Sequence, residues 1–166
     1  KDCSMNLSIN LNNEEYRKWI KTKKVNNPLN VTFTQKQRVN GQILDNISSE
    51  QNFKHFKNRL NKRVFGNGYR RFNKQLEMLV IREGTSQIRH HLHCVIEQPK
   101  RFGFNEFVSL IKTEWLNTKF GYNHIHIEKP TTQERVDGWL DYIMKDRTKI
   151  DLSTSIDFEN STILDH

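Results

Sequence analysis

Two histidines separated by a single residue, His91 and His93, suggest metal chemistry by their type and spacing. The segment around them has the composition of a β-strand, and alternate residues of a strand point to the same face. Two imidazoles about 7 Å apart along a strand can converge on one divalent ion. Such pairs more often belong to the surface or the core, and His124 and His126 form a second pair in this chain. The spacing alone therefore does not establish a metal site.

A second feature lies in the last predicted helix, where Tyr142 and Lys145 are three residues apart. Residues at this spacing share one helical face, so we expect the phenol and the ammonium to be neighbours. Both point away from the apolar stripe of Val136, Leu140 and Ile143 at about 100° per residue. A tyrosine so placed is open to a substrate and can act as a nucleophile. The alternative is a boundary tyrosine packed beside an exposed lysine.

Strands and helices must bring these two features together. Segments rich in β-branched and aromatic residues are predicted to be strands. They are Val31–Lys36, Leu76–Glu83, Arg89–Glu97 and Tyr122–Glu128. The second and third should form a hairpin around the polar turn Gly84–Gln87, and we expect a polar loop around Asn40 and Gly41.

Helices are predicted where apolar residues recur at helical spacing behind a capping residue. The predicted starts are Asn12 with Glu15, Ser48, Asn105, and Thr131 with Glu134. The second helix should end near Gly66 and Gly68, and the third near Lys119. This order predicts an α+β fold, with a central, mainly antiparallel sheet and flanking helices. The chain contains no phosphate-binding loop of the kind that ATP-driven motors require.

The 166 residues are enough for one domain with a hydrophobic core. We expect that domain to span residues 1–149, with its central part at 31–147, and residues 150–166 to be a polar tail or linker stub. The first residue is Lys1, so we expect an excised or trimmed piece. Two distant cysteines favour a reducing, intracellular setting, and no segment is apolar enough to span a bilayer, so no membrane partner is expected.

The net charge of +8 and the isoelectric point of about 9.6 favour an anionic partner. No Asp or Glu occurs between Gln51 and Leu76, where many cations alternate with aromatic residues. Cations that follow phosphates, beside rings that stack on unpaired bases, favour single-stranded nucleic acid. The alternative is a solvated helix face with core aromatics. The predicted contact residues are Lys54, Lys57, Lys62, Arg63, Tyr69, Arg70, Arg71 and Lys74.

These motifs resemble those of the HUH endonucleases, a family named for two histidines that flank a hydrophobic residue. His91-Leu92-His93 matches that signature, Tyr142-x-x-Lys145 resembles the nucleophile motif, and Val31-Thr32-Phe33-Thr34 resembles the first, strand-forming motif. The three occur in the family's order, from Val31 to about Arg147. The order of the motifs, with the tyrosine after the histidines, resembles that of the replication initiators and single-tyrosine transposases. Asp146, at the next helical turn, argues against a motif with two tyrosines.

The resemblance implies an HUH or Rep nuclease-like fold, a variant of the ferredoxin or RRM-like sheet. It also implies Mg²⁺ or Mn²⁺ held by His91, His93 and an acidic residue. Tyr142, assisted by Lys145, would attack the DNA backbone, release a 3′-hydroxyl and form a 5′-phosphotyrosine that a later 3′-hydroxyl can reverse. Nicking and joining of single-stranded DNA at an origin or hairpin would start rolling-circle replication. A helicase domain or host helicase is an expected partner, in a prokaryotic cytoplasm or a host nucleus.

Three glutamates are candidates for the third metal ligand: Glu77, Glu83 and Glu97. Opposite residues of an antiparallel pair point to the same face, so the length of the turn decides between them. A four-residue turn would put Glu83 on the face opposite the histidines, whereas a five-residue turn, Gly84–Ile88, would pair Glu83 with Arg89 and put it on their face. The resemblance favours the five-residue turn and Glu83, because viral replication initiators carry an acidic residue at the same spacing.

Three other functions are compatible with the sequence. A single-tyrosine transposase of the same family would use the same residues. A non-catalytic nucleic-acid-binding module would retain DNA but form no covalent adduct. A histidine-based metal hydrolase without a covalent step would lose little activity when Tyr142 becomes Phe.

Overall fold

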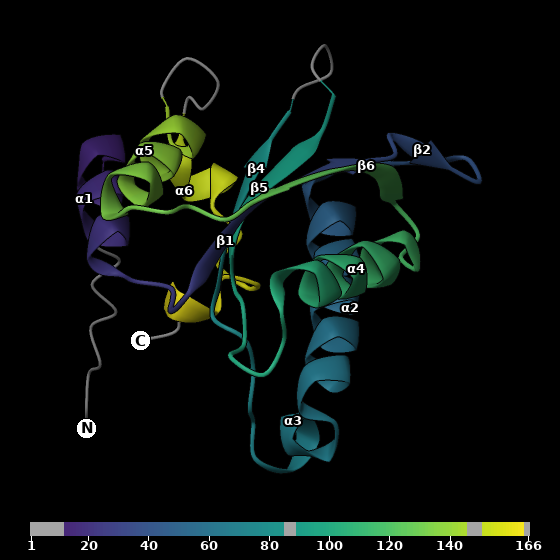
Figure 1. Cartoon of the computed structure of the whole chain (residues 1–166). Coiled ribbons are helices and arrows are strands. Elements are labelled where there is room, and N and C mark those ends of the chain that lie inside the picture. The colour runs from purple at the N-terminus through teal and green to yellow at the C-terminus, as the bar shows by residue number, and fades with distance from the viewer. Residues whose placement is uncertain (1–11, 85–88, 146–150, 165–166) are drawn as a thin grey trace, which may run out of the picture.

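A four-stranded antiparallel sheet forms the centre of the computed structural model, which describes residues 12–84, 89–145 and 151–164 (Figure 1). The spatial strand order is β4-β5-β1-β6, and all three neighbouring pairs are antiparallel. The strands are β1 (Pro28–Gln35), β4 (Met78–Glu83), β5 (His91–Glu97) and β6 (Gly121–Glu128). The predicted α+β class and the four predicted strands are confirmed. In place of the expected loop, β2 (Arg38–Val39) and β3 (Gln42–Ile43) form a short hairpin.

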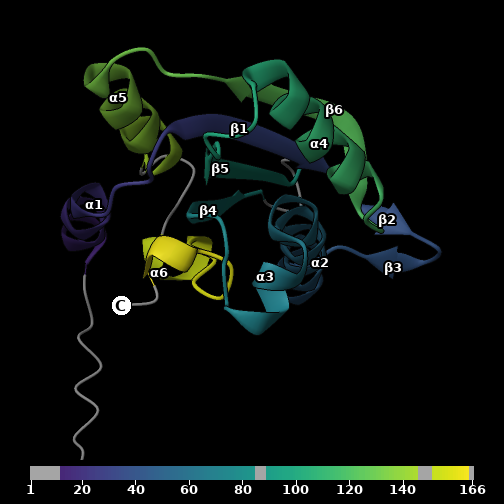
Figure 2. The same ribbon diagram turned by 60° about the horizontal axis from the view of Figure 1, so that its bottom comes forward.

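Helices lie on both faces of the sheet (Figure 2). On one face lie α2 (Asn46–Phe65) and α4 (Phe104–Leu116), and the short α3 (Asn67–Arg71) follows α2. The other face carries α1 (Asn13–Thr22), α5 (Gln133–Ile143), α6 (Leu152–Ser155) and the 3₁₀ turn η2 (Thr162–Leu164). The central order is thus β1-α2-β4-β5-α4-β6. The second face is covered by α1, which precedes this unit, and by α5, α6 and η2, which follow it.

Each face of the sheet has its own apolar core. Phe33 of β1 packs against Phe53 and Phe56 of α2 and against Trp115 of α4, with ring centroids 4.4 to 6.1 Å apart. Leu92, on the strand of the two histidines, is fully buried in this core. The two histidines are therefore held on the opposite face, as the strand alternation predicts.

The second core lies between the sheet and α5. Leu79 and Ile81 of β4 and Val95 of β5 pack with Leu140 and Ile143 of α5. All five side chains are at least nine-tenths buried. At about 25 cal/mol per Å² of apolar area, this burial is enough to hold α5 firmly on the histidine face.

Side chains cap α1, α2 and α5, whereas α4 has no side-chain cap, and two of the predicted caps were wrong. Asn12 and Glu15 form the expected capping box of α1. The cap of α2 is Asp45, whose side chain accepts a hydrogen bond from the amide of Ser48. The Ser48 hydroxyl in turn accepts from the amide of Asp45. Thr132, not Thr131, caps α5. In both cases the capping side chain lies at the position before the first helical turn and reaches the third residue of that turn.

The C-terminal segment corrects the expectation of a polar tail at 150–166. Residues 151–164 cover the outer edge of β4, where Ser161 Oγ accepts from the amide of Val80 and Thr162 Oγ1 accepts from the amide of Met78. Leu152 and Ile156 are buried in the second core. Hydroxyl groups thus satisfy the open edge of the sheet, and this polar segment belongs to the domain.

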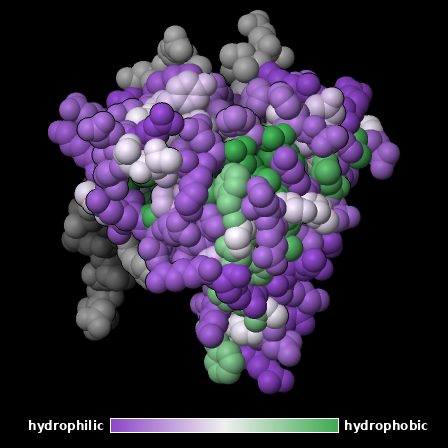
Figure 3. Space-filling view, in the orientation of Figure 1, coloured by the Kyte–Doolittle hydropathy of each residue, from purple (hydrophilic) through white to green (hydrophobic). Residues whose placement is uncertain are grey.

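The face of the molecule seen in Figure 3 is mostly hydrophilic, with apolar residues gathered near α4 and the edge strand β6. Within the described part of the chain, no helix combines the length and the apolar character that crossing a membrane would require.

Candidate active site

The β4–β5 register decides which glutamate faces the histidines. Glu83 lies directly opposite His91, and Ile81 lies opposite His93. The predicted five-residue turn was wrong, because the connection extends from Gly84 to His90, two residues longer. Adding two residues keeps the face unchanged, so the predicted placement of Glu83 on the histidine face is confirmed. Residues 85–88 of that turn lie outside the described residues.

His93 is the most buried member of the cluster and has a partner at each ring nitrogen. Its Nε2 lies 2.6 Å from Oε2 of Glu83, and its Nδ1 lies 3.2 Å from Oγ1 of Thr32 on β1. Thr32 pairs with His93 across the sheet. The hydroxyl and the carboxylate hold the imidazole between them, and this fixes its orientation.

His91 is half-buried, and its ring lies 6.3 Å from the ring of His93 at an interplanar angle of 22°. Burial, followed by the nearby His91, lowers the pKa of His90 below its usual value. Gly84 has a φ of +153°, and a Cβ there would lie 2.6 Å from Nδ1 of His90. The chain can turn this closely around His90 only because residue 84 has no side chain.

The nucleophile candidate comes from α5. Tyr142 is 49% exposed, and its ring meets the ring of His93 edge-on with centroids 6.0 Å apart. Trp139, one turn earlier, stacks on Tyr142 at 5.7 Å and also contacts His93 at 5.8 Å. The expected accessibility of Tyr142 is confirmed. The structure thus brings the phenol and the two histidines to one site on the sheet.

Lys145 is a neighbour of Tyr142, as expected, although it follows the C-cap Met144 instead of lying in the helix. Its Nζ is 3.9 Å from the centroid of the Tyr142 ring. A cation over an aromatic face is attracted to the ring electrons and stabilises negative charge that develops on the ring. Asp146, which argued against a second tyrosine, lies outside the described residues.

The three side chains suit a divalent ion by their chemical type. Glu83, His91 and His93 offer one carboxylate and two imidazoles on a single face. In the described part of the chain, however, no three His, Cys, Asp or Glu side chains are arranged around a common point as ligands. The short bond between Glu83 and His93 occupies two of the donor atoms. Metal binding therefore requires this bond to open so that both atoms turn toward the ion.

The other two glutamates are far from this cluster along the hairpin. Glu97 Oε1 accepts from the amide of Glu77, and Glu77 Oε2 accepts from the amide of Asn26. Burial, opposed by that amide, raises the pKa of Glu97 above its usual value. Both carboxylates therefore serve the end of the sheet where β4 begins.

The basic run on α2 and α3 does not adjoin the site. The helix α2 covers the opposite face of the sheet, and α3 lies at the end of the molecule away from the C-terminal end of β4 (Figure 1). Several predicted DNA contacts have partners within the protein. Lys54 pairs with Glu159, Lys57 is buried and donates to the carbonyl of Glu159, and Arg63 lies 3.7 Å from Glu114.

Within the same run, the Tyr69 hydroxyl donates to Asn58, so this ring is held against α2. The side chains of Lys62, Arg70, Arg71 and Lys74 are exposed. Lys57 is the clear correction, because its ammonium supports the C-terminal segment from inside the fold. The exposed four remain candidates for DNA contact.

Two neighbours of the site were missed. Thr32 was read only as part of a strand motif, and Trp139 was not selected. A cation–π contact was missed as well, in which the Arg89 guanidinium lies 4.4 Å from the ring centroid of Tyr122. Strand alternation could have identified Thr32, which stands among buried apolar residues of β1. No sequence signal joins Arg89 to Tyr122.

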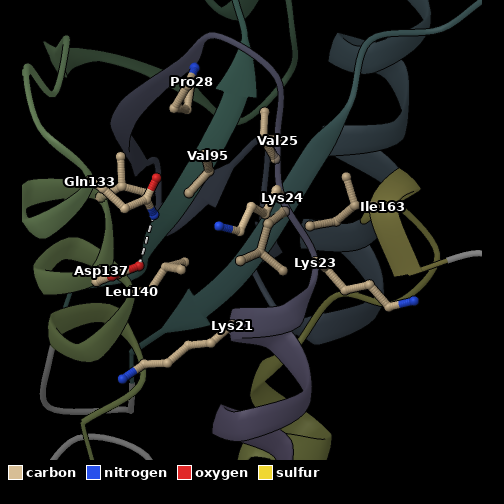
Figure 4. A pocket seen from close by; sticks show the side chains of 12 residues that line it. Lys21, Lys23, Lys24, Val25, Pro28, Val95, Gln133, Asp137, Leu140 and Ile163 are labelled. Carbon is tan, nitrogen blue, oxygen red and sulfur yellow. Dashed lines mark hydrogen bonds between the residues drawn. The ribbon is translucent and has the colours of Figure 1, made fainter.

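A separate pocket of about 100 Å³ lies between α1, α5 and the sheet (Figure 4). Its floor is apolar, and three lysines stand around it, with Lys21 and Lys23 extending away from the floor. None of the candidate catalytic residues lines this pocket. Cys94 is also excluded as a nucleophile, because complete burial, with Asp157 nearby, raises the pKa of its thiol well above the usual value.

Comparison of the chain with protein-family models, with curated proteins and with solved structures finds no match. The residues of the site are therefore the basis on which a function can be inferred.

Proposed function

We propose that this domain is a metal-dependent endonuclease that nicks and rejoins single-stranded DNA through a covalent tyrosine link, with Tyr142 as the nucleophile. The observation that carries the proposal is the contact between Tyr142 of α5 and His93 of β5 at 6.0 Å. Three sequence features that resemble the HUH endonuclease motifs thus meet at one place: the histidine pair, the tyrosine and, through Thr32, the first strand motif.

The fold supports the same proposal. The order β1-α2-β4-β5-α4-β6 with the strand arrangement β4-β5-β1-β6 is the β-α-β-β-α-β plan of ferredoxin-like domains. The resemblance implies a variant of this plan for a Rep-type nuclease. Fold alone does not identify function, so the proposal depends mainly on the cluster of residues.

Each residue has a distinct part in the proposed reaction. Tyr142 Oη attacks the phosphorus of a backbone phosphate, a P–O bond to Tyr142 forms, and the bond to O3′ breaks. The proton of the phenol ends on the released 3′-hydroxyl. Lys145, beside the ring, stabilises negative charge on the phenol as the proton leaves. The reverse step uses a 3′-hydroxyl to displace Tyr142, which restores the strand.

Glu83, His91 and His93 would hold a divalent ion, Mg²⁺ or Mn²⁺, which when bound polarises the scissile phosphate. Thr32 orients the His93 ring from its other nitrogen. A carboxylate in the donor set favours Mg²⁺ or Mn²⁺ over zinc.

The test is covalent capture from a pool of random single-stranded oligonucleotides in the presence of Mn²⁺. A label at the 3′ end should transfer to the protein and withstand denaturation, whereas a label at the 5′ end should leave with the released fragment. Tyr142→Phe should remove the adduct and keep DNA binding nearly unchanged, because the ring still packs against Trp139 and His93. Binding without an adduct in the unmodified protein would instead identify a binding module, and an adduct in Tyr142→Phe would exclude this nucleophile.

A further inference from the structure

An open depression beside Tyr142 has a composition that suits a flat, polar ligand. It lies between α5, β1 and β6. Its lining residues are Asn30, Glu128, Arg135, Gly138, Trp139 and Tyr142.

Asn30 is the unusual member of this lining. It is 5% exposed, and its Oδ1 is buried without a hydrogen-bond partner among the described residues. Asn30 is two residues before Thr32 on β1 and so points to the same face as His93. A buried acceptor without a partner costs free energy, and a ligand that donates a hydrogen bond recovers it.

The rest of the depression provides an aromatic surface and room above it. Trp139 and Tyr142 lie nearly parallel, at 25°, with centroids 5.7 Å apart. Gly138 leaves the helix surface open there, since a Cβ at this position would meet nothing within 4 Å. Arg135 stands at the rim, 3.4 Å from Glu128 across from it. Rings that stack, a buried amide and a cation at the rim are the features that hold one nucleotide.

We propose that this depression binds one unpaired adenine of the DNA strand, stacked on Trp139 beside Tyr142, with its amino group donating to Asn30. An asparagine side chain offers an acceptor and a donor side by side, which matches the amino group and the adjacent ring nitrogen of adenine. The base would be next to the phosphate that Tyr142 attacks. This position rests on the proposed function, whereas the binding of the base does not.

The test measures binding in EDTA, so that no cleavage occurs. A fluorescent oligothymidine with one central adenine is compared with the same strand carrying unsubstituted purine, which lacks the amino group, at that position. The unmodified protein should bind the adenine strand about tenfold more tightly than the purine strand. Asn30→Leu should remove this preference, and Asn105→Leu, an exposed position on α4, should retain it.

A second variant separates binding from folding. Gly138→Leu fills the depression from an exposed helix position and should lower the affinity for the adenine strand to that for the purine strand, with no loss of thermal stability. Absence of any preference in the unmodified protein, or a preference that survives in both Asn30→Leu and Gly138→Leu, overturns the proposal. Free AMP that binds as tightly as the strand overturns the assignment to DNA. If adenine preference is found but no covalent adduct ever forms, the base site stands and the nicking function falls.

Discussion

Glu83 lies opposite His91 in the strand register, yet its carboxylate bonds to His93, with 2.6 Å between Oε2 and Nε2. The carboxylate therefore reaches diagonally across the strand pair to the imidazole of His93, while its own register partner is His91. Glu83 thus connects to one histidine through its side chain and to the other through strand pairing. This geometry makes Glu83 the best candidate for the third metal ligand.

Replacing Glu83 tests this assignment. Glu83→Ala should weaken Mn²⁺ binding, measured by the electron paramagnetic resonance signal of the free ion. It should also lower the rate of cleavage at limiting metal by at least about tenfold. Excess Mn²⁺ should restore part of the activity, because the two imidazoles remain. Glu106→Gln, an exposed glutamate on α4, is the matched control. Normal cleavage by Glu83→Ala at limiting metal would remove Glu83 from the ligand set.

Lys145 should act on the rate more than on affinity. Its Nζ lies over the Tyr142 ring, so Lys145→Ala removes a cation next to the reacting phenol and only one charge from a large charged surface. Single-turnover cleavage should therefore slow about tenfold or more, while the dissociation constant for single-stranded DNA changes less than about threefold. Equal losses in rate and affinity would show that Lys145 is only a phosphate contact.

Local sequence patterns predicted the elements well because each pattern reports on its own segment. The face of Glu83 followed from parity alone, and the exposure of Tyr142 followed from the apolar stripe of α5. The hairpin register could not be predicted, because the turn around residues 85–88 offers several lengths with the same polar composition. A turn that is two residues longer leaves Glu83 on the same face of the sheet. The predicted face of Glu83 is therefore correct, although the predicted turn length is wrong.

Long-range pairings set the limit of prediction from sequence. The segment 151–164 reads as a polar tail, because its serines and threonines give no apolar period; their hydroxyls bond to β4, which no local signal indicates. Lys57 was assigned to DNA binding because it lies in an acid-free run, but its partner Glu159 is distant in the chain. Asn30 was also missed, because no local signal shows that its Oδ1 is buried without a hydrogen-bond partner among the described residues.

The basic run can be tested with two matched pairs of arginines. Arg70 and Arg71 are exposed on α3, whereas Arg59 and Arg63 both lie near Glu114. If exposed cations of this run follow the DNA backbone, then replacing Arg70 and Arg71 with Ala should flatten the slope of log affinity against log salt by about one to two units. Replacing Arg59 and Arg63 should change the slope less and the stability more. If neither variant changes the slope, the basic run is a solvated surface that does not contact the DNA backbone.

Glu97 should make the stability of the fold depend on pH in a defined direction. Burial raises its pKa above the usual value, so folding favours the protonated carboxyl. The stability that this preference contributes is fully present below the ordinary pKa of about 4.5 and is lost as the pH rises through the raised value. At neutral pH the folded protein therefore holds a carboxylate in a place that favours a neutral group.

Glu97→Gln keeps the acceptor for the amide of Glu77 and removes the charge. Its melting temperature should exceed that of the unmodified protein at pH 7 by up to about 2 °C, and the two should converge near pH 4, where the carboxyl is protonated. Thermal melts across this range, followed by circular dichroism, measure the difference. Glu106→Gln should melt at the same temperature as the unmodified protein at both pH values, since Glu106 is exposed on α4. A lower melting temperature for Glu97→Gln at pH 7 would mean that the Glu97 carboxylate stabilises the fold, against the direction of its pKa.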